Sequence, residues 1–202
     1  MNDIADAGQR WNVVASRTLL EHWLITVRSD TVHLPDNHQM ERTVVTHPGS
    51  VAVLALDADQ RVLMIRQYRH PVGRLLWEIP AGLRDVDGEP LLATAQRELL
   101  EETGWRAGEW HVLVDYFMSP GFSTERTRIF LARDVEQVPG VDYTREDEEK
   151  FLLADWVPLA DAVRLALEGS LHNGPAITGV LAAHAARSAG FSGLRLADAP
   201  EA

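Results

Sequence analysis

Two apolar runs early in the chain constrain its fold more than any other feature. Residues 51–56 (VAVLAL) and 62–65 (VLMI) contain no polar side chain, and a short polar stretch, Asp57-Ala58-Asp59-Gln60, lies between them. Uninterrupted apolar runs of this length are typical of strands that are covered on both faces. The polar residues between them suit a tight connection, so the sequence predicts a largely buried β-hairpin at the start of the core.

The other segments mix strands and helices without strict alternation. Strands are expected at 75–80, 110–117, 126–133 and 151–159, and helices at 90–103, 159–170 and 174–188. Before the core, residues 23–34 and 39–47 are rich in β-branched residues and predict a small β arm. Because strands and helices do not form a repeated βαβ series, the pattern favours an α+β fold with one main domain.

The charge balance excludes some classes of partner. The chain has 30 acidic and 19 basic residues, for a formal charge of -11, which argues against nucleic acid or an anionic membrane as a ligand. There is no cysteine, so disulfides, zinc thiolates and thiol catalysis are excluded. The first ten residues lack the charge and apolar pattern of a signal peptide, and no apolar run is long enough to span a membrane. We therefore expect a cytoplasmic protein.

The predicted helix at 90–103 carries an unfavourable set of charges. Glu98, Glu101 and Glu102 share one helical face, where like charges three or four residues apart repel each other. They also precede Thr103-Gly104, a plausible helix end, where the helix dipole favours cations. Local rules broken without an evident structural gain point to a functional site, and a bound divalent cation would remove both conflicts.

These glutamates belong to a longer pattern, Gly82-x6-Glu89-x7-Arg97-Glu98-Leu99-Leu100-Glu101-Glu102-Thr103-Gly104-Trp105. The pattern resembles the signature box of the Nudix hydrolases, except that six residues rather than five separate Gly82 from Glu89. The resemblance implies that Glu98 and Glu102 are the main metal ligands, with Glu101 assisting and the backbone carbonyl of Ala81 completing the site. Arg97 would orient a box carboxylate. Oxygen donors of this kind suit Mg²⁺ or Mn²⁺ that also bind substrate phosphates.

Hydrolysis by such a site needs a base to activate water. In many Nudix hydrolases that base lies outside the box on a loop, and here the acidic run 146–149 is the candidate. Glu149 is the first choice because it is nearest the following strand, and Glu148 is the second. A solvated loop with no catalytic role remains the alternative for this run.

Other segments resemble the ADP-ribose pyrophosphatase subgroup of the family. Pro120 stands fifteen residues beyond Trp105, as in that subgroup, and residues 66–83 resemble its approach to the box. The resemblance implies that Arg69, with Arg66 as a second candidate, contacts the diphosphate, and that Glu78 lies near the metals. It also implies that the β arm exchanges between two subunits of a homodimer. Glu41, on this arm, is a candidate to reach the ligand across such a dimer, which the sequence alone does not show.

The resemblance implies an α+β fold of the Nudix type, an α/β/α sandwich with a mixed sheet, plus the N-terminal β arm. The expected organisation is an arm at 1–47, a hydrolase domain at 48–193 and a disordered tail at 194–202. The expected reaction is metal-dependent hydrolysis of ADP-ribose to AMP and ribose 5-phosphate. The alternatives are a Nudix hydrolase for another nucleoside diphosphate sugar or dinucleotide, and a non-catalytic nucleotide sensor on the same fold.

Overall fold

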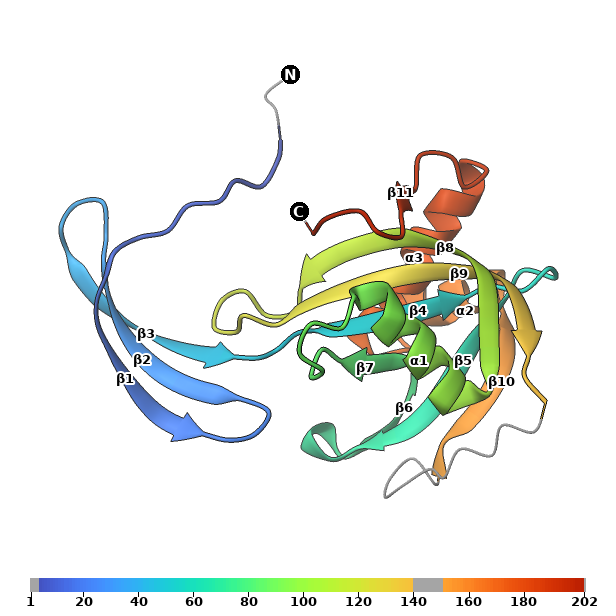
Figure 1. Cartoon of the computed structure of the whole chain (residues 1–202), viewed down its shortest axis with the longest axis horizontal. Coiled ribbons are helices and arrows are strands. Elements are labelled where there is room, and N and C mark those ends of the chain that lie inside the picture. Colours follow the sequence, from blue (N-terminus) through green and yellow to red (C-terminus); the bar gives the residue numbers. More distant parts are fainter. Residues whose placement is uncertain (1–3, 140–150, 202) are drawn as a thin grey trace. The chain divides into compact units, whose positions relative to one another are not determined.

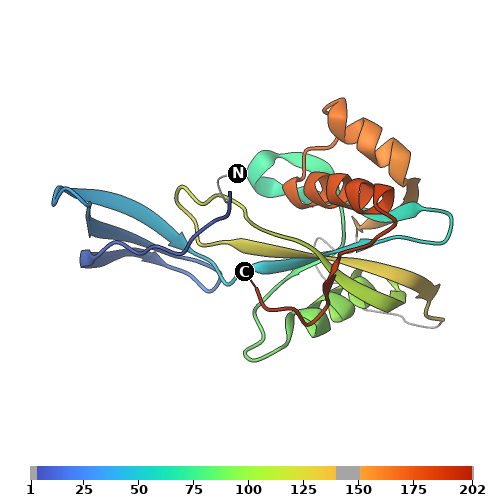
Figure 2. The ribbon, with the colours of Figure 1, turned by 90° about the horizontal axis from the view of Figure 1, so that it is seen from above.

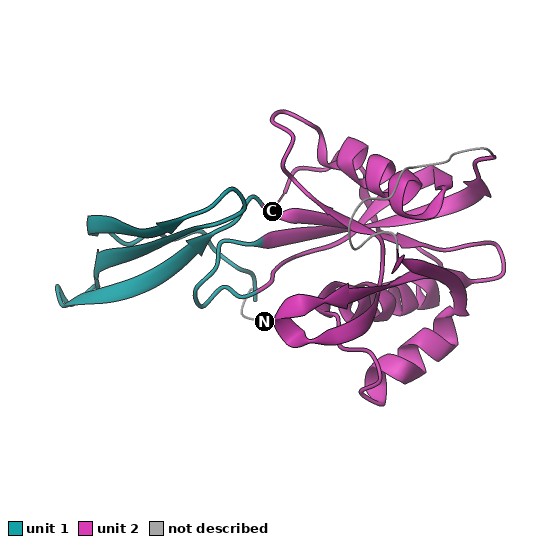
Figure 3. Ribbon diagram, turned by 90° about the horizontal axis from the view of Figure 1, so that it is seen from below, with its two compact units in different colours: residues 1–48, 119–125 teal, residues 49–118, 126–202 magenta. Residues whose placement is uncertain are grey.

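The computed structural model describes residues 4–139 and 151–201. The chain forms two compact units: residues 1–48 with 119–125 make unit 1, and residues 49–118 with 126–202 make unit 2 (Figure 3). Each unit is described by itself below. Among the described residues, no helix is long and apolar enough to cross a membrane.

Unit 1 is a three-stranded antiparallel sheet. Its strands are β1 (Val13–Glu21), β2 (Thr26–His33) and β3 (Gln39–Thr46), in the order β1-β2-β3. The segment 119–125 lies along β3: the Val45 N–H donates to the Phe122 carbonyl at 2.8 Å, and the Thr124 N–H donates to the Val45 carbonyl at 2.9 Å. The sequence predicts only the two later strands, because β1 is exposed along its whole length and has no clear apolar alternation.

Unit 2 contains two sheets, labelled in Figure 1. The five-stranded sheet has the order β11-β8-β9-β4-β7 and the three-stranded sheet has the order β10-β5-β6. Strand β4 pairs with β9 in parallel, whereas the other pairs are antiparallel, so the larger sheet is mixed. The strands are β4 (Ser50–Ala55), β5 (Arg61–Arg69), β6 (Arg74–Glu78), β7 (Ala81–Leu83), β8 (Trp105–Phe117), β9 (Arg126–Gln137), β10 (Leu153–Pro158) and β11 (Arg195–Leu196).

The predicted hairpin at the start of the core is wrong in its pairing. Both apolar runs are buried strands, but β4 lies in the larger sheet and β5 in the smaller one, with a single bridge between Leu56 and Val62. Strand β4 already has a neighbour on each side, β9 and β7, and therefore has no free edge for β5. A short polar connection shows that two strands follow each other along the chain, but it does not determine which strand each one pairs with.

Helices lie on both faces of the larger sheet, as Figure 2 shows. Helix α1 (Leu91–Thr103) packs through Ala95 and Leu99 on the face formed by Val51 and Val53 of β4. Helix α3 (Gly174–Ser188) packs on the other face, where the alternate residues of β4 point, and α2 (Leu159–Leu167) packs on α3 and on β5 and β10 of the smaller sheet. A 3₁₀ turn, η1 (His70–Val72), joins β5 to β6. The predicted α/β/α arrangement with a mixed sheet is confirmed.

The last part of the chain differs from the disordered tail that the sequence predicts. Strand β11 pairs with β8, and the Arg128 guanidinium donates to the carbonyls of Ala199 at 2.7 Å and Pro200 at 3.1 Å. Arg128 also donates to both carboxylate oxygens of Asp115, at 2.7 and 2.9 Å, and both side chains are buried. The segment lacks hydrophobic periodicity, so the sequence contains no pattern that predicts its order. Its attachment depends on these arginine contacts.

The Asp115–Arg128 pair generates a stability prediction. Burial by itself raises the pKa of Asp115, but hydrogen bonds from Arg128 and Arg195 outweigh it and hold that pKa below its usual value. We expect Asp115→Asn to lower the free energy of unfolding at pH 7 by about 3 kcal/mol, because Arg128 stays buried without its carboxylate. Urea denaturation measures this change.

The pH dependence of that change follows from the lowered pKa of Asp115. A carboxylate whose folded pKa is depressed stabilises the fold above its unfolded pKa of about 3.9, and the contribution is lost as the pH falls through the folded value. The difference between wild type and variant should therefore shrink as the pH falls below about 4. Asp161→Asn, in an exposed pair with Arg164, is the control and should leave the free energy of unfolding nearly unchanged, at pH 7 and below about pH 4 alike. An Asp115→Asn protein as stable as wild type at pH 7 contradicts the prediction.

Candidate active site

Helix α1 positions the acidic cluster. The helix starts after Pro90, which has extended backbone angles, and ends at Gly104, whose φ of 74° suits glycine and whose N–H donates to the Leu100 carbonyl. Its apolar contacts, Ala95 and Leu99, point into the core. Glu102 lies three residues after Leu99 on the same face and is only 8% exposed. The packing of the helix therefore carries one glutamate of the cluster to a buried place.

Arg97 is the centre of an ion-pair network on this helix. Its guanidinium donates to Glu98 at 2.7 Å and to Glu101 at 3.1 Å, and reaches both carboxylate oxygens of Glu89 at 3.4 and 3.2 Å. Thr94 also donates to Glu89, at 2.8 Å. The repulsion that the sequence analysis attributes to a missing cation is thus partly offset by a cation of the chain itself. The predicted role of Arg97 in orienting a box carboxylate fits these contacts.

Two of the glutamates meet the chain at Ala81 and Gly82 of β7. The Glu102 carboxylate accepts a hydrogen bond from the Ala81 N–H at 2.9 Å. The Glu98 carboxyl lies so close to Gly82 that a Cβ on that residue would be 2.0 Å from the Glu98 Cδ. Only a residue without a side chain leaves room for Glu98 there. The glycine and the two glutamates are far apart in the sequence, and the fold brings them to one place beside the Ala81 backbone.

The electrostatic environment of Glu98 differs from that of Glu89. Burial raises the pKa of the Glu98 carboxyl and the neighbouring Glu101 raises it further, although Arg97 opposes both effects. For Glu89, hydrogen bonds from Arg97 and Thr94 lower the pKa. Glu98 is therefore a partly desolvated acid beside like charges, whose charged form a further cation would stabilise. Glu89 is already satisfied by the groups of the protein.

The donor set at Ala81–Gly82 suits a hard divalent cation. The carboxylate oxygens of Glu98 and Glu102 lie beside the Ala81–Gly82 backbone, and oxygen donors of this kind are the ligands that Mg²⁺ and Mn²⁺ prefer. Over residues 4–139 and 151–201, no three acidic or histidine side chains are arranged as a complete metal site. The reason is visible in the contacts: Arg97 holds Glu98 and Glu101, so these two side chains would have to turn from Arg97 to complete a coordination shell.

Comparisons with known proteins show the family of the chain. The family model described as "NUDIX domain" matches residues 46–178. The chain is 43% identical over 175 residues to an ADP-ribose pyrophosphatase of Mycobacterium tuberculosis, covering 87% of this chain and 84% of that protein. The chain belongs to the Nudix family. It is also 37% identical over 153 residues to an ADP-ribose pyrophosphatase of Bacillus subtilis, covering 75% of this chain and 80% of that one.

A solved structure supports the fold assignment independently. The crystal structure of an ADP compounds hydrolase superposes with a TM-score of 0.75 and covers 92% of this chain and 99% of its own. At 20% sequence identity, this likeness concerns the fold alone. Nudix hydrolases generally need divalent metal ions, so the oxygen cluster on α1 has the composition that the family chemistry needs.

The two arginines that the sequence analysis assigns to the diphosphate lie on opposite faces of β5. Arg69 forms a two-point ion pair with Glu78, at 2.9 and 2.7 Å, and Glu78 is 2% exposed. Arg66 instead lies over the Trp77 ring at 5.6 Å, and Trp77 packs toward the core below α2 and α3. Trp77 and Glu78 are successive strand residues, so they point to opposite faces. Arg66 and Arg69 therefore do not act side by side, and each assignment stays a prediction.

The remaining predicted residues are placed as follows. Pro120 and Glu41 belong to unit 1, in the segment beside β3 and in β3 itself, and their contribution to a substrate pocket stays a prediction. Glu148 and Glu149 lie outside the described residues. Two contacts of this Nudix site had no sequence signal: Thr94 on Glu89, and Gln67 within 3.4 Å of Glu78. Thr94 reaches back to Glu89 across the start of α1, and Gln67 reaches Glu78 across the β5–β6 pair.

The contact between Gly82 and Glu98 generates a prediction for the metal site. Gly82→Ala should weaken Mn²⁺ binding about tenfold or more, because the new Cβ displaces the Glu98 carboxyl from the β7 backbone. Mn²⁺ titration followed by electron paramagnetic resonance, without substrate, measures the dissociation constant. Gly121→Ala is the matched control, since no atom lies within 4 Å of a Cβ at that position. Unchanged Mn²⁺ affinity in Gly82→Ala contradicts the assignment of Glu98.

Proposed function

We propose that this Nudix protein hydrolyses the diphosphate of ADP-ribose, giving AMP and ribose 5-phosphate, with Mg²⁺ or Mn²⁺ as the cofactor. The observation that carries the proposal is the meeting of Glu98 and Glu102 at Ala81–Gly82, in a chain with a complete run of box residues from Glu89 to Trp105. The choice of ADP-ribose rests on the 43% identity to a protein named ADP-ribose pyrophosphatase. Both supports are needed, because the box specifies the chemistry and not the substrate.

The residues of the chain have distinct roles in the proposed reaction. Glu98 and Glu102 hold the cation, with help from Glu101 and the carbonyl of Ala81. Arg97 fixes the direction of Glu98 and Glu101 while it is itself held by Glu89. A cation held by these residues would supply Lewis-acid chemistry, polarising a phosphoryl oxygen and offsetting the charge that develops on the leaving group. The contacts of Arg97 thus reduce the repulsion between carboxylates that must lie close together.

Substrate contacts are proposed for residues on the α1 side of the sheet and in unit 1. Strand alternation puts Arg69 and Glu78 on the same side as Leu63, which packs toward α1. The Arg69 side chain is 43% exposed while Glu78 fixes its direction, so it is suited to receive a diphosphate from solvent. Arg66 is the weaker candidate because it faces the other side. Pro120 and Glu41 are proposed to shape the pocket for the nucleoside.

Two alternatives use the same site. A different nucleoside diphosphate sugar or a dinucleotide would need the same cation and the same glutamates, with other pocket residues deciding the choice. A non-catalytic sensor would bind the nucleotide without hydrolysing it, and the intact set of glutamates speaks against that reading. The homodimer with exchanged arms stays a prediction. The cytoplasmic location inferred from the sequence also stays a prediction.

The function test is hydrolysis of ADP-ribose in ¹⁸O water with Mg²⁺. We expect AMP and ribose 5-phosphate as products, with ¹⁸O in one of them marking the phosphorus that water attacks. A panel of nucleoside diphosphate sugars and dinucleotides compared by kcat/KM should rank ADP-ribose first. Glu102→Gln should reduce kcat about 100-fold or more while the far-ultraviolet circular dichroism spectrum stays the same.

Each contrary outcome of that test points to a different error. If another diphosphate is turned over faster than ADP-ribose, the proposed substrate is wrong and the proposed hydrolytic chemistry stands. Tight binding of ADP-ribose without product would favour the sensor. Full activity in Glu102→Gln would contradict the metal assignment. Glu125→Gln, outside the box on the segment beside β3, is the comparison variant for a charge loss elsewhere.

The proposed base is Glu149, with Glu148 as the second candidate. Glu149→Gln should lower kcat about 100-fold, because a positioned base typically contributes 10²- to 10⁴-fold, while the dissociation constant for the substrate stays within about twofold. Single-turnover kinetics and equilibrium binding of ADP-ribose separate the two effects. Glu148→Gln is measured in parallel. If only Glu148→Gln loses kcat, Glu148 is the base. If both variants have normal rates, the base is not in the acidic run 146–149.

A further inference from the structure

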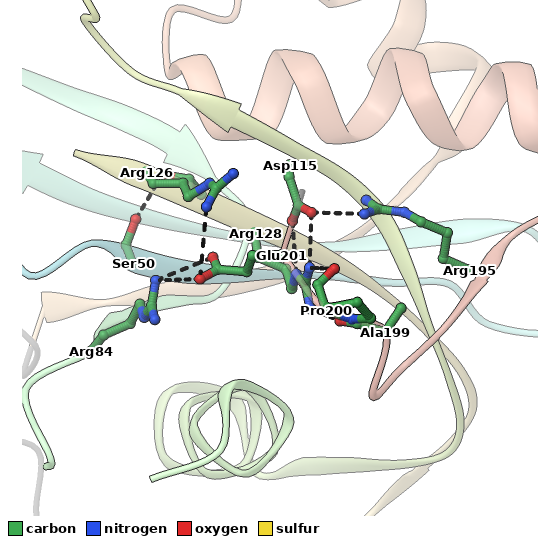
Figure 4. A network of polar contacts seen from close by, with 10 residues as sticks. Ser50, Arg84, Asp115, Arg126, Arg128, Arg195, Ala199, Pro200 and Glu201 are labelled. Atoms are coloured by element: carbon green, nitrogen blue, oxygen red, sulfur yellow. Dashed lines mark hydrogen bonds and ion pairs between the residues drawn. The ribbon is translucent and has the colours of Figure 1, made fainter. Parts of the chain in front are cut away.

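A carboxylate near the end of the described chain contacts the loop that leads into the acidic helix. Arg84 lies two residues after Gly82, at the start of the loop between β7 and α1. Its guanidinium is 3.2 Å from both carboxylate oxygens of Glu201, and Glu201 is also 4.0 Å from the guanidinium of Arg126 on β9 (Figure 4). Glu201 thus ties the start of the loop to the neighbouring sheet through two arginines.

The segment that carries Glu201 is itself firmly attached. Arg128 donates to the carbonyls of Ala199 and Pro200, and Arg128 is held in turn by the buried Asp115, as Figure 4 shows. The Ala199 N–H donates to the Leu196 carbonyl at 3.0 Å, just after the pairing of β11 with β8. Glu201 is therefore presented from a fixed backbone, which reduces the entropy that its ion pair must overcome.

The loop from Arg84 to Glu89 needs such an attachment. It has one residue more than the Nudix pattern, and its middle is open: Val86 is 53% exposed and Gly88 has no neighbouring atom within 4 Å of a Cβ position. Besides the Glu201 pair, the Arg84 N–H donates to the Gly49 carbonyl at 3.2 Å. At the far end of the loop, Glu89 is held by Thr94 and Arg97. The loop is thus fixed at its two ends.

The far end of this loop is part of the acidic network. Glu89 accepts hydrogen bonds from Nε and Nη2 of the Arg97 guanidinium, whose Nη1 donates to Glu98 and Glu101. A displacement of the loop would move Glu89. The Arg97 guanidinium would then either shift with Glu89 or lose its hydrogen bonds to that carboxylate. Either outcome changes the direction of the carboxylates that are proposed to bind the cation. The chain of contacts runs from Glu201 through Arg84 and the loop to Glu89 and Arg97.

We propose that Glu201 is a positioning residue of the metal site, and that it acts by fixing the loop 84–89 through Arg84. The inference rests on the proposed metal-dependent function, but its effect on the loop and on cation binding is separate from the identity of the substrate. A competing interpretation is that Arg84 and Arg126 form an anion site for the substrate, which Glu201 occupies and blocks. That interpretation predicts a lower KM or tighter nucleotide binding when the Glu201 charge is removed.

The test compares wild type with Glu201→Gln, Arg84→Gln and the double variant, each as the full chain. Mn²⁺ binding is measured by electron paramagnetic resonance without substrate, and amide hydrogen exchange is followed for peptides covering 84–90. Each single variant should bind Mn²⁺ about threefold to tenfold more weakly, below the loss for groups bonded directly to ligands, and the loop should exchange faster. The double variant should lose no more than either single one, because both remove the same contact.

Kinetics add a second readout and a control. With ADP-ribose, Glu201→Gln should lower kcat while KM stays within about twofold, since the residue does not contact the substrate. Glu168→Gln, which removes the partner of Arg164 at 2.9 Å on α2, should change none of these quantities. Wild-type loop exchange and Mn²⁺ affinity in Glu201→Gln overturn the proposal. A lower KM or tighter nucleotide binding in that variant also overturns it, in favour of the blocked anion site.

If the wild type does not hydrolyse ADP-ribose, the proposed substrate fails and the positioning role is still decided. In that case the Mn²⁺ titration and the loop exchange give the answer without any turnover. If the wild type is active but Mn²⁺ binding and loop exchange are the same in wild type and Glu201→Gln, the function stands and the positioning role falls. The two failures are therefore distinguishable.

Discussion

The arrangement of the site depends on one guanidinium that is shared by three carboxylates. Arg97 contacts Glu89, Glu98 and Glu101, and without it α1 would carry adjacent like charges at the end where the helix dipole is also unfavourable. Because Arg97 is planar and always charged, it fixes directions as well as neutralising charge. The acidic helix is therefore tolerated without a bound cation, and a cation at the proposed site would compete with Arg97 for two of the glutamates.

The sheet supplies the second condition for this site. Strand β4 lies between β9 and β7, and the pairing of β7 with β4 holds Ala81 and Gly82 against the acidic helix. The burial of α1 against β4 brings Glu102 to the Ala81 N–H and Glu98 to the Cα of Gly82. A hydrophobic core thus determines the distances in a polar site. Strand alternation has a further effect: it separates Arg66 from Arg69, although both are candidates for the diphosphate in the sequence.

The local elements were largely predictable, whereas several pairings were not. Helix α1 could be predicted because Leu99 and Gly104 give it an apolar face and an end signal that need no distant partner. The metal glutamates could be proposed because their unfavourable spacing is itself local. The supposed hairpin failed because the edges of β4 are taken by strands from elsewhere in the chain. The ordered segment with Ala199 and Glu201 could not be predicted, since its partners Arg128 and Arg84 are more than seventy residues away.

The sequence by itself determined the family and the position of most strands and helices of the core, because each of these is set by residue types at short spacing. Only the tertiary structure decided which carboxylates meet Ala81 and Gly82, which face of the sheet each arginine takes, and which segment holds the loop before α1. The reason is physical: spacing along one helix or strand is fixed by its own geometry, whereas contacts between elements depend on the free energy of packing the whole core.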